Sequence, residues 1–182
     1  MTMNDKIIGI DCDDVILDLM PNWLSKYNKQ FNDILVKDQI NDWNVGNFVL
    51  SEAKKIFYQY IEEPDVFWTA KPIEGALEGV LALRNMGFRI VIVSAGNPFS
   101  IKQQWLKYHG FIENDKDFIQ AYDKSLIKID YLIDDKYDNV RDTFGYGILF
   151  SQPWNKKYDY NPRVNNWEEV ITVIKNRENI NV

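Results

Sequence analysis

The chain has 182 residues, of which 46% are hydrophobic and 26% charged, and its formal net charge is −6. This length and composition are ordinary for one globular domain with a buried core, and the acidic balance excludes a nucleic-acid polymer as partner, because such binding needs clustered Lys and Arg. A small phosphorylated substrate is compatible with this net charge, since a nearby lysine or a metal ion outweighs the weak electrostatic field of the whole protein.

The first predicted elements are a strand and a helix with an acidic cluster between them. Residues 7–10 are apolar and predict a short buried strand. Apolar residues then recur at roughly helical spacing over residues 15–27, which predicts a helix. Asp11 and Asp13 are therefore expected where the strand gives way to the helix.

The next stretch interrupts the alternation of strands and helices. It is rich in aromatic residues, and its pattern is helical or irregular. We interpret residues 21–69 as a small, mainly helical cap inserted after the first strand, and residues 1–20 and 70–182 as the core. One domain with one insertion is expected, because no linker composition, low-complexity stretch or repeat divides the chain.

The remaining chain alternates between helices and strands. Its expected elements are a helix at 75–86, a strand at 88–94, a helix at 101–108, strands near 118–121, 131–133 and 146–150, and a closing helix at 167–177. This alternation is typical of a Rossmann-like α/β fold, in which helices cover both faces of a parallel sheet. Such sheets bind their ligands at the carboxyl ends of the strands.

Two acidic pairs follow strands of this predicted sheet. Asp11 and Asp13 follow the first strand, and Asp134 and Asp135 follow the strand at 131–133. Each pair alone is compatible with a helix cap or a solvated turn, where Asp is common. Both pairs are expected at the same edge of one sheet, however, and carboxylates gathered there suit Mg²⁺.

A pair of carboxylates after the first strand suits phosphoryl transfer. An aspartate nucleophile forms an aspartyl-phosphate and needs a cation to offset its repulsion from the phosphate. A second carboxylate protonates the leaving alkoxide and later deprotonates the attacking water. The pattern therefore predicts a nucleophile and a general acid/base side by side, whereas Asp14 fits better as a helix cap or as a residue that supports the two.

Other residues are candidates for phosphate binding. Ser94 ends a predicted strand and is followed by Ala95 and Asn97, so its hydroxyl and nearby backbone N–H groups can donate to phosphate oxygens. Lys124 can bring a positive charge to the phosphate and the nucleophile. Taken singly, Ser is a common turn residue and Lys a common surface residue. His109 is the only histidine, so a Ser-His-Asp mechanism is not expected.

The cysteine content and the start of the chain bear on its location. Cys12 is the only cysteine, so no intramolecular disulfide forms and a reducing compartment is expected. The polar residues 1–6 and the short apolar run after them match neither a signal peptide nor a membrane span. The sequence predicts a cytoplasmic protein with no membrane partner.

As an ordered set, these motifs resemble those of the haloacid dehalogenase (HAD) superfamily. The set comprises Asp11-Cys-Asp13-Asp14-Val15, Ser94, Lys124 and Asp134-Asp135. Within that superfamily the chain is similar to the 5'(3')-deoxyribonucleotidases, through residues 11–18, 67–68, 72–76, 123–124 and 130–135. Residues 149–155, which end in Gln-Pro-Trp-Asn, and residues 163–169 resemble the tail of bacterial and phage members.

The resemblance implies a role for each motif. Asp11 is then the nucleophile and Asp13 the general acid/base of a phosphatase. Ser94, Ala95 and Lys124 hold the phosphoryl group that is transferred. The substrate is a small phosphorylated compound, namely a deoxyribonucleoside or ribonucleoside monophosphate, and relatives are often homodimers.

The resemblance also implies that Mg²⁺ is the cofactor. It is bound by Asp11, by the backbone carbonyl of Asp13 and by one of Asp134 or Asp135, a choice that the sequence leaves open.

The aromatic cap is expected to contact a nucleobase. The family closes an aromatic-lined cap over a pyrimidine base, and Phe67, Trp68 and Trp43 are the candidates here. The same rings would equally build a small core for the cap itself. The residue before Asp123 is Tyr122, where mammalian members carry Arg, so the nucleotide preference is left open. Lys102 can replace part of that positive charge, or it can equally well lie on a helix surface.

Three alternatives follow from the same residues. A non-enzymatic phospho-acceptor module of the response-regulator kind also gathers acidic residues and a Lys on a parallel sheet, but it has no cap. A dehalogenase needs no second carboxylate, so Asp13 argues against it. A phosphatase of the same fold for a sugar phosphate or a nucleic-acid 3'-phosphate differs only in its substrate.

Overall fold

The computed structural model describes residues 6–96 and 98–180, which form a six-stranded parallel sheet in the order β3-β2-β1-β4-β5-β6. Its strands are β1 (Ile7–Ile10), β2 (Arg89–Ser94), β3 (Phe118–Gln120), β4 (Tyr131–Asp134), β5 (Tyr146–Phe150) and β6 (Arg163–Val164). The predicted Rossmann-like α/β fold is confirmed. Within the described residues, no helix has the length and apolar character that a membrane crossing requires.

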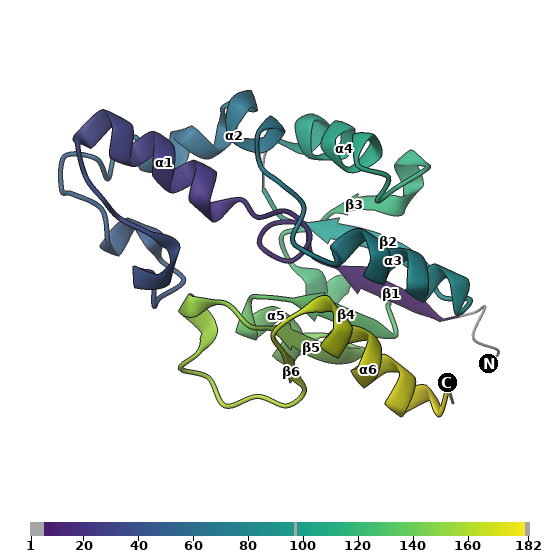
Figure 1. Ribbon diagram of the computed structural model, residues 1–182. Helices are drawn as coiled ribbons and strands as arrows, with labels where there is room; N and C mark the ends of the chain where they lie inside the picture. Colours follow the sequence, from purple (N-terminus) through teal and green to yellow (C-terminus); the bar gives the residue numbers. More distant parts are fainter. Residues whose placement is uncertain (1–5, 97, 181–182) are drawn as a thin grey trace.

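The helices surround this sheet and extend past its end. They are α1 (Met20–Phe31), α2 (Pro64–Trp68), α3 (Ala76–Asn85), α4 (Phe99–Tyr108), α5 (Tyr137–Asp142) and α6 (Trp167–Glu178). Short 3₁₀ helices span Lys37–Gln39, Val45–Asn47, Phe57–Glu62, Asp115–Asp117, Lys124–Leu126 and Pro153–Asn155. The strand arrows in Figure 1 point toward the side of the molecule on which α1 lies. The segment between β1 and α3 therefore faces the carboxyl ends of the strands.

Most of the predicted elements are found within a few residues of their expected bounds. The strands predicted at 7–10 and 146–150 match to the residue. The sequence did not predict β6 and α5, because two and six residues are too few to establish a periodicity. Residues 1–5 of the polar start, and Asn97, lie outside the described residues.

The first predicted helix is wrong at its amino end, because α1 begins only at Met20. The preceding residues form a tight turn in which Asp14 has a left-handed backbone with φ of 57°. The N–H of Ile16 donates to the carbonyl of Cys12 at 3.0 Å, and the N–H of Ile73 donates to the carbonyl of Ile16 at 2.7 Å. A turn that folds back onto a neighbouring segment buries apolar residues as a helix face does, so the spacing alone did not distinguish the two.

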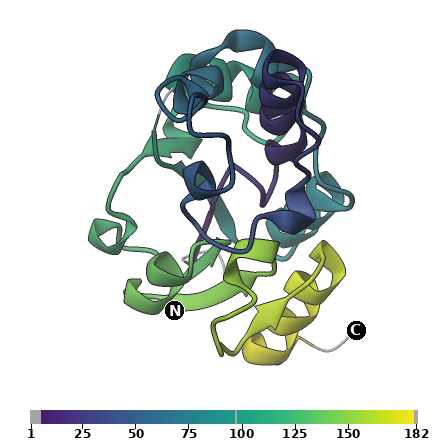
Figure 2. The ribbon, with the colours of Figure 1, turned by 90° about the vertical axis from the view of Figure 1, so that its left-hand side faces the viewer.

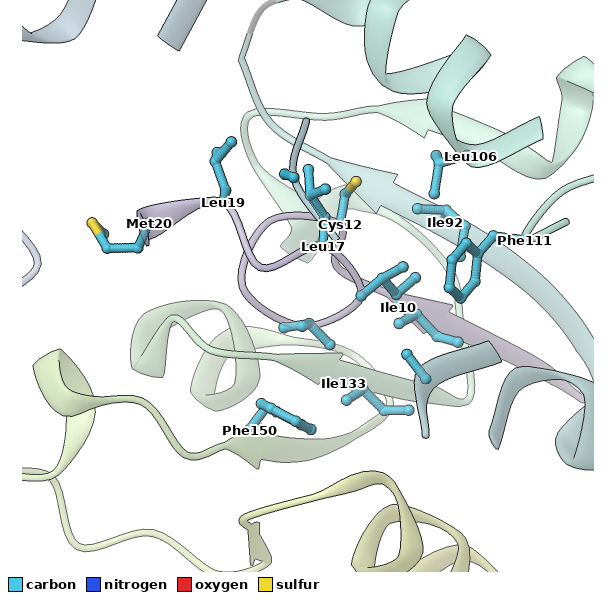
Figure 3. Packing of buried hydrophobic residues seen from close by; sticks show 14 of the residues in the cluster. Ile10, Cys12, Leu17, Leu19, Met20, Ile92, Leu106, Phe111, Ile133 and Phe150 are labelled. Atoms are coloured by element: carbon cyan, nitrogen blue, oxygen red, sulfur yellow. The ribbon is translucent and has the colours of Figure 1, made fainter. Parts of the chain in front are cut away.

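A hydrophobic core runs from the sheet to the start of α1. Ile10, Cys12 and Leu17 are fully buried, and Leu19 and Met20 extend the cluster toward α1 (Figure 3). Burying a large apolar side chain contributes roughly 1.5–3 kcal/mol. The acidic residues that alternate with these apolar ones are therefore held in place by their neighbours.

The segment between β1 and α3 that the sequence predicts as an insertion (residues 21–69, the inserted segment) contains an aromatic cluster of its own. Trp23 of α1 stacks on Phe57 with ring centres 4.4 Å apart, and its indole N–H donates to the carbonyl of Phe57 at 2.9 Å. Tyr27 meets the same ring edge-on at 5.7 Å. Offset and edge-on pairs of this kind contribute about 0.5–1.5 kcal/mol each beyond their burial. These contacts tie α1 to the 3₁₀ helix that begins at Phe57.

The packing of α3 on α6 gives a first prediction. Gly79 of α3 faces Trp167 of α6, and a Cβ at this position would clash with the indole ring. Gly→Ala in an exposed helix stabilises by roughly 0.5–1 kcal/mol, but overpacking costs about 1–3 kcal/mol. We predict that Gly79→Ala lowers the free energy of unfolding measured with urea. Glu78→Ala, on the exposed side of the same helix, is the control and is expected to change it by less than about 0.5 kcal/mol. A Gly79→Ala protein more stable than the parent would contradict this packing.

Candidate active site

Carboxylates from two neighbouring strands meet at one edge of the sheet. Asp11 directly follows β1, Asp134 ends β4 and Asp135 follows it. Because β1 and β4 pair in parallel, their carboxyl ends lie side by side. Carboxylate oxygens of the three residues all lie within 4.8 Å of one another, and the three residues are buried. The structure thus brings Asp11 of the first acidic pair together with both members of the second pair.

Lys124 lies between two of these carboxylates. Its Nζ donates to Asp11 Oδ1 at 2.5 Å and to Asp134 Oδ2 at 2.7 Å, and the residue is 2% exposed. Burial lowers the pKa of the Lys124 ammonium, but the two carboxylates outweigh burial and hold that pKa above its ordinary value. The lysine therefore stays charged and offsets part of the repulsion within the cluster.

The side chain of Asp134 has hydrogen bonds to both of its oxygens. Oδ1 accepts from the backbone N–H of Lys136 at 2.8 Å and from Asn139 Nδ2 at 3.1 Å. Oδ2 accepts from Lys124 at 2.7 Å and from Asn139 Nδ2 at 3.0 Å. Burial nevertheless raises the pKa of Asp134 to about 6. Both oxygens of Asp134 therefore already accept hydrogen bonds from groups of the protein.

The side chain of Asp135 is held at one oxygen only. Oδ2 accepts from the indole N–H of Trp154 at 2.7 Å, whereas the buried Oδ1 has no hydrogen-bond partner among residues 6–96 and 98–180. Burial, together with the negative charges of Asp11 and Asp134, raises the pKa of Asp135 well above its usual range. A buried carboxylate oxygen with no donor, beside a second carboxylate, is suited to a hard divalent cation. The residues present fit Mg²⁺. Of Asp134 and Asp135, it is Asp135 that has a carboxylate oxygen free to bind the ion within the described part of the chain.

Asp13 faces a second buried lysine. Lys102, from α4, donates to Asp13 Oδ2 at 2.6 Å, to Ser94 Oγ at 3.0 Å and to the carbonyl of Ala95 at 3.0 Å. Burial raises the pKa of Asp13, and the ammonium of Lys102 opposes that rise. Burial acts against the charge of Lys102 as well, but Asp13 outweighs it and the pKa of Lys102 is raised.

The sequence did not reveal the position of Lys102. This lysine is 1% exposed, and its Nζ lies 5.4 Å from the ring centre of Phe67. The position of Lys102 within its helix is compatible with a buried side chain and with an exposed one. Only the packing of α4 against β2 and α2 shows that it is buried. The hydroxyl of Ser94, expected to face the phosphate, contacts Lys102 instead.

A cavity of about 380 Å³ opens at this edge of the sheet. Its polar lining includes Asp11, Asp13, Asp135, Lys124 and Lys136, with Ala95 and Gly96 beside them; its aromatic lining comes from Trp23, Trp43, Tyr58, Tyr122 and Trp154. This size lies within the range of roughly 300–1,000 Å³ that is usual for small-molecule sites. The combination of carboxylates, a lysine and aromatic faces suits a small ligand with a phosphate and a planar ring.

The predicted aromatic residues differ in their relation to this cavity. Trp43 lines it, whereas Phe67 and Trp68 do not. Phe67 is fully buried, and Trp68 packs edge-on against Tyr108 with ring centres 6.1 Å apart. Tyr58 lines the cavity although it was not a candidate. A sequence rich in aromatic residues does not tell which rings form the core of the segment and which face a ligand.

Hydrogen bonds fix the ring of Tyr58. Its hydroxyl donates to Asn44 Oδ1 at 2.8 Å and accepts from the N–H of Gly46 at 3.1 Å. The ring is about half exposed and forms part of the cavity wall. A ring held by its hydroxyl in this way presents a fixed face to a ligand.

Comparisons with known proteins find a matching family and close relatives of known name. Residues 5–179 match the family described as "5' nucleotidase, deoxy (Pyrimidine), cytosolic type C protein". The chain is 31% identical to a 5'(3')-deoxyribonucleotidase of Clostridium acetobutylicum, over 92% of this chain and 93% of that protein. It is 30% identical to a 5'(3')-deoxyribonucleotidase of Bacillus subtilis, over 91% and 96%.

A solved structure shows the same fold. The HAD-hydrolase YfnB of Bacillus subtilis, bound to magnesium, superposes with a TM-score of 0.59 and covers 93% of this chain and 98% of its own, at 13% identity. At this identity the likeness is one of fold.

The unequal surroundings of Asp134 and Asp135 give a second prediction. In metal-free protein at slightly alkaline pH, Asp135→Asn removes a like charge and supplies an N–H beside Asp11, so we expect it to raise the free energy of unfolding by about 1 kcal/mol. Asp134→Asn weakens the pairing of the buried Lys124 and is expected to lower it by about 1–3 kcal/mol. Urea denaturation in the presence of a chelator measures both. Shifts of the same sign in the two variants would contradict the assignment.

Proposed function

This chain belongs to the 5' nucleotidase, deoxy (pyrimidine), cytosolic type C protein family and is a phosphoric monoester hydrolase, and on that premise we propose that it is a Mg²⁺-dependent 5'(3')-deoxyribonucleotidase acting through an aspartyl-phosphate. The observation that carries the proposal is Asp11, which accepts from the ammonium of Lys124 and clusters with Asp135, whose Oδ1 has no donor within the described residues. Lys124 supplies positive charge on one side of this nucleophilic carboxylate, and a cation bound at the free oxygen of Asp135 would supply it on the other before Asp11 approaches a phosphate.

The proposed metal ligands are Asp11, the backbone carbonyl of Asp13 and Asp135. Asp135 is chosen over Asp134 because its Oδ1 has no donor within the described part of the chain. When bound, Mg²⁺ supplies charge compensation for the phosphate oxygens and for the carboxylates. Asp134 then serves to hold Lys124, whose Nζ it binds at 2.7 Å.

Asp11 is the proposed nucleophile and Asp13 the proposed general acid/base. Asp11 attacks phosphorus, the bond to the leaving oxygen breaks, and Asp13 protonates that oxygen. In the second half, Asp13 takes a proton from water, which hydrolyses the aspartyl-phosphate. Burial raises the pKa of Asp13, which favours its protonated form at the start of the reaction.

The proposed phosphate contacts are Lys124 and the backbone around Ala95. Lys124 and Ala95 line the cavity, and the next residue, Gly96, has a positive φ of 74°. Ser94 does not line the cavity, and its hydroxyl accepts from Lys102. We propose that Ser94 helps to hold Lys102, which in turn binds Asp13 Oδ2 at 2.6 Å.

We propose that residues 21–69 form a cap over the substrate. Trp43 and Tyr58 are the proposed stacking faces for a nucleobase, since both line the cavity that the carboxylates of the core also line. Phe67 and Trp68 lie outside this cavity, so we give them no contact with the base. A small nucleoside monophosphate is the proposed partner, in a cytoplasmic setting.

The proposed chemistry predicts a trapped phosphoenzyme. In Asp13→Asn the nucleophile remains, but the second step lacks its base, so we expect slow turnover and a gain of one phosphoryl group in the intact-protein mass. Asp11→Asn is expected to lose on the order of a thousandfold or more in kcat and to gain no phosphoryl group. Asp142→Asn, exposed and outside the cavity, is the matched control.

The outcomes of this experiment separate the two roles. Turnover by Asp11→Asn close to the parent rate would refute the covalent mechanism. Unimpaired hydrolysis by Asp13→Asn, with no adduct, would remove Asp13 from its role and leave Asp11 as the nucleophile.

A substrate panel tests the nucleotide preference. We predict higher kcat/KM for deoxyribonucleoside monophosphates than for ribonucleotides and sugar phosphates. Tyr58→Ala is expected to raise KM for nucleotides about tenfold, the effect of losing one stacked ring, with KM for a sugar phosphate unchanged. Tyr108→Ala, an exposed aromatic residue outside the cavity, is the control. Equal kcat/KM across the panel would overturn the proposed preference for deoxyribonucleotides.

A further inference from the structure

Residues 152–155, Gln-Pro-Trp-Asn, have no role in the function proposed so far. They follow β5 and form a turn that contains the 3₁₀ helix Pro153–Asn155. Gln152, Trp154 and Asn155 are all buried although each carries a polar group. Buried polar groups are costly unless they are paired, so the contacts of these three side chains are informative.

Two of these side chains hold Asp135. The indole N–H of Trp154 donates to Asp135 Oδ2 at 2.7 Å, and Asn155 Nδ2 donates to the backbone carbonyl of Asp135 at 2.7 Å. Asn155 is itself fixed, because its Oδ1 accepts from Arg163 at 2.7 Å. The side chain and the backbone of Asp135 are therefore both bound from a single turn.

The same turn reaches the other strand and the inserted segment. Gln152 Nε2 donates to the carbonyl of Asp14 at 2.6 Å, next to Asp13. The ring of Trp154 lies 5.5 Å from the ammonium of Lys37, which also binds Asp14 Oδ1 at 2.8 Å. Figure 2 shows the turn, in yellow-green, beside the blue trace of the inserted segment, and the 3₁₀ helices Lys37–Gln39 and Pro153–Asn155 are in contact.

The geometry of Asp135 depends on the indole N–H. A carboxylate rotates about the bond to its Cβ, and a donor fixed on one oxygen determines where the other points. With Trp154 bound to Oδ2, the free Oδ1 is the oxygen without a donor in the described residues, and Asp135 lies within 4.8 Å of Asp11 in the acidic cluster. Partners that orient a metal ligand in this way typically account for a 10–100-fold difference in metal affinity.

We propose that Trp154 is a positioning residue for the metal site: its indole N–H orients Asp135 so that Oδ1 is presented to the cation. The inference rests on the proposed function, because it takes Asp135 as a Mg²⁺ ligand. The turn at 152–155 thereby acquires a role, since Gln152 binds the loop after β1 while Trp154 contacts Asp135 and Lys37 of the inserted segment.

The test is calorimetric titration of Mg²⁺ into the metal-free protein, which needs no turnover. We expect Trp154→Phe to weaken Mg²⁺ binding by on the order of 10- to 100-fold. Trp105→Phe is the matched control, because Trp105 is also buried and also donates its indole N–H, to the carbonyl of Ala70 at 3.1 Å. It is expected to bind Mg²⁺ as the parent does. If Trp154→Phe does not fold, Trp154→benzothienylalanine keeps the shape of the ring and removes only the N–H.

The outcomes distinguish this inference from the proposed function. Parent-like Mg²⁺ affinity in the Trp154 variant would overturn the positioning role, and so would an equal loss in Trp105→Phe, since general loosening of the core would then explain both. Asp135→Asn is titrated alongside. Undiminished Mg²⁺ affinity in Asp135→Asn would instead overturn the proposed metal site.

Discussion

The paired contacts of Lys124 with Asp11 and Asp134 are the interaction on which the rest of the site depends. Buried carboxylates that meet at one sheet edge repel one another, and removing each from water costs several kcal/mol unless it is compensated. Lys124 binds one carboxylate from each strand, at 2.5 and 2.7 Å. Lys102 compensates Asp13 in the same way at 2.6 Å. Within the described residues no lysine donates to Asp135, and this imbalance makes the site suited to a cation.

The pairing of β1 with β4 brings these unevenly compensated carboxylates together. Parallel pairing sets Ile10 beside Ile133, and the residues after them share one edge. Cys12 is fully buried between Asp11 and Asp13, so its burial directs the carboxylates on either side of it away from the core. The left-handed backbone of Asp14 then turns the chain before α1 begins. The inserted segment can therefore face the carboxylates without disturbing the strands.

Strand order and motif order made the central cluster predictable. Asp11, Asp134 and Lys124 follow from acidic residues at strand ends and from the order of the motifs, because parallel strands bring distant residues to one edge. The choice of Asp135 over Asp134 was not predictable, since it depends on donors such as Trp154 whose positions only tertiary packing determines. The burial of Lys102 was hidden for the same reason.

Crystallography with Mn²⁺ in place of Mg²⁺ tests the central claim most directly, because anomalous scattering locates the ion independently of any activity. The account predicts a peak bound by carboxylate oxygens of Asp11 and Asp135 and by the backbone carbonyl of Asp13, with Lys124 still between Asp11 and Asp134. A peak coordinated by Asp134 instead of Asp135, or no ion at this edge of the sheet, would contradict it.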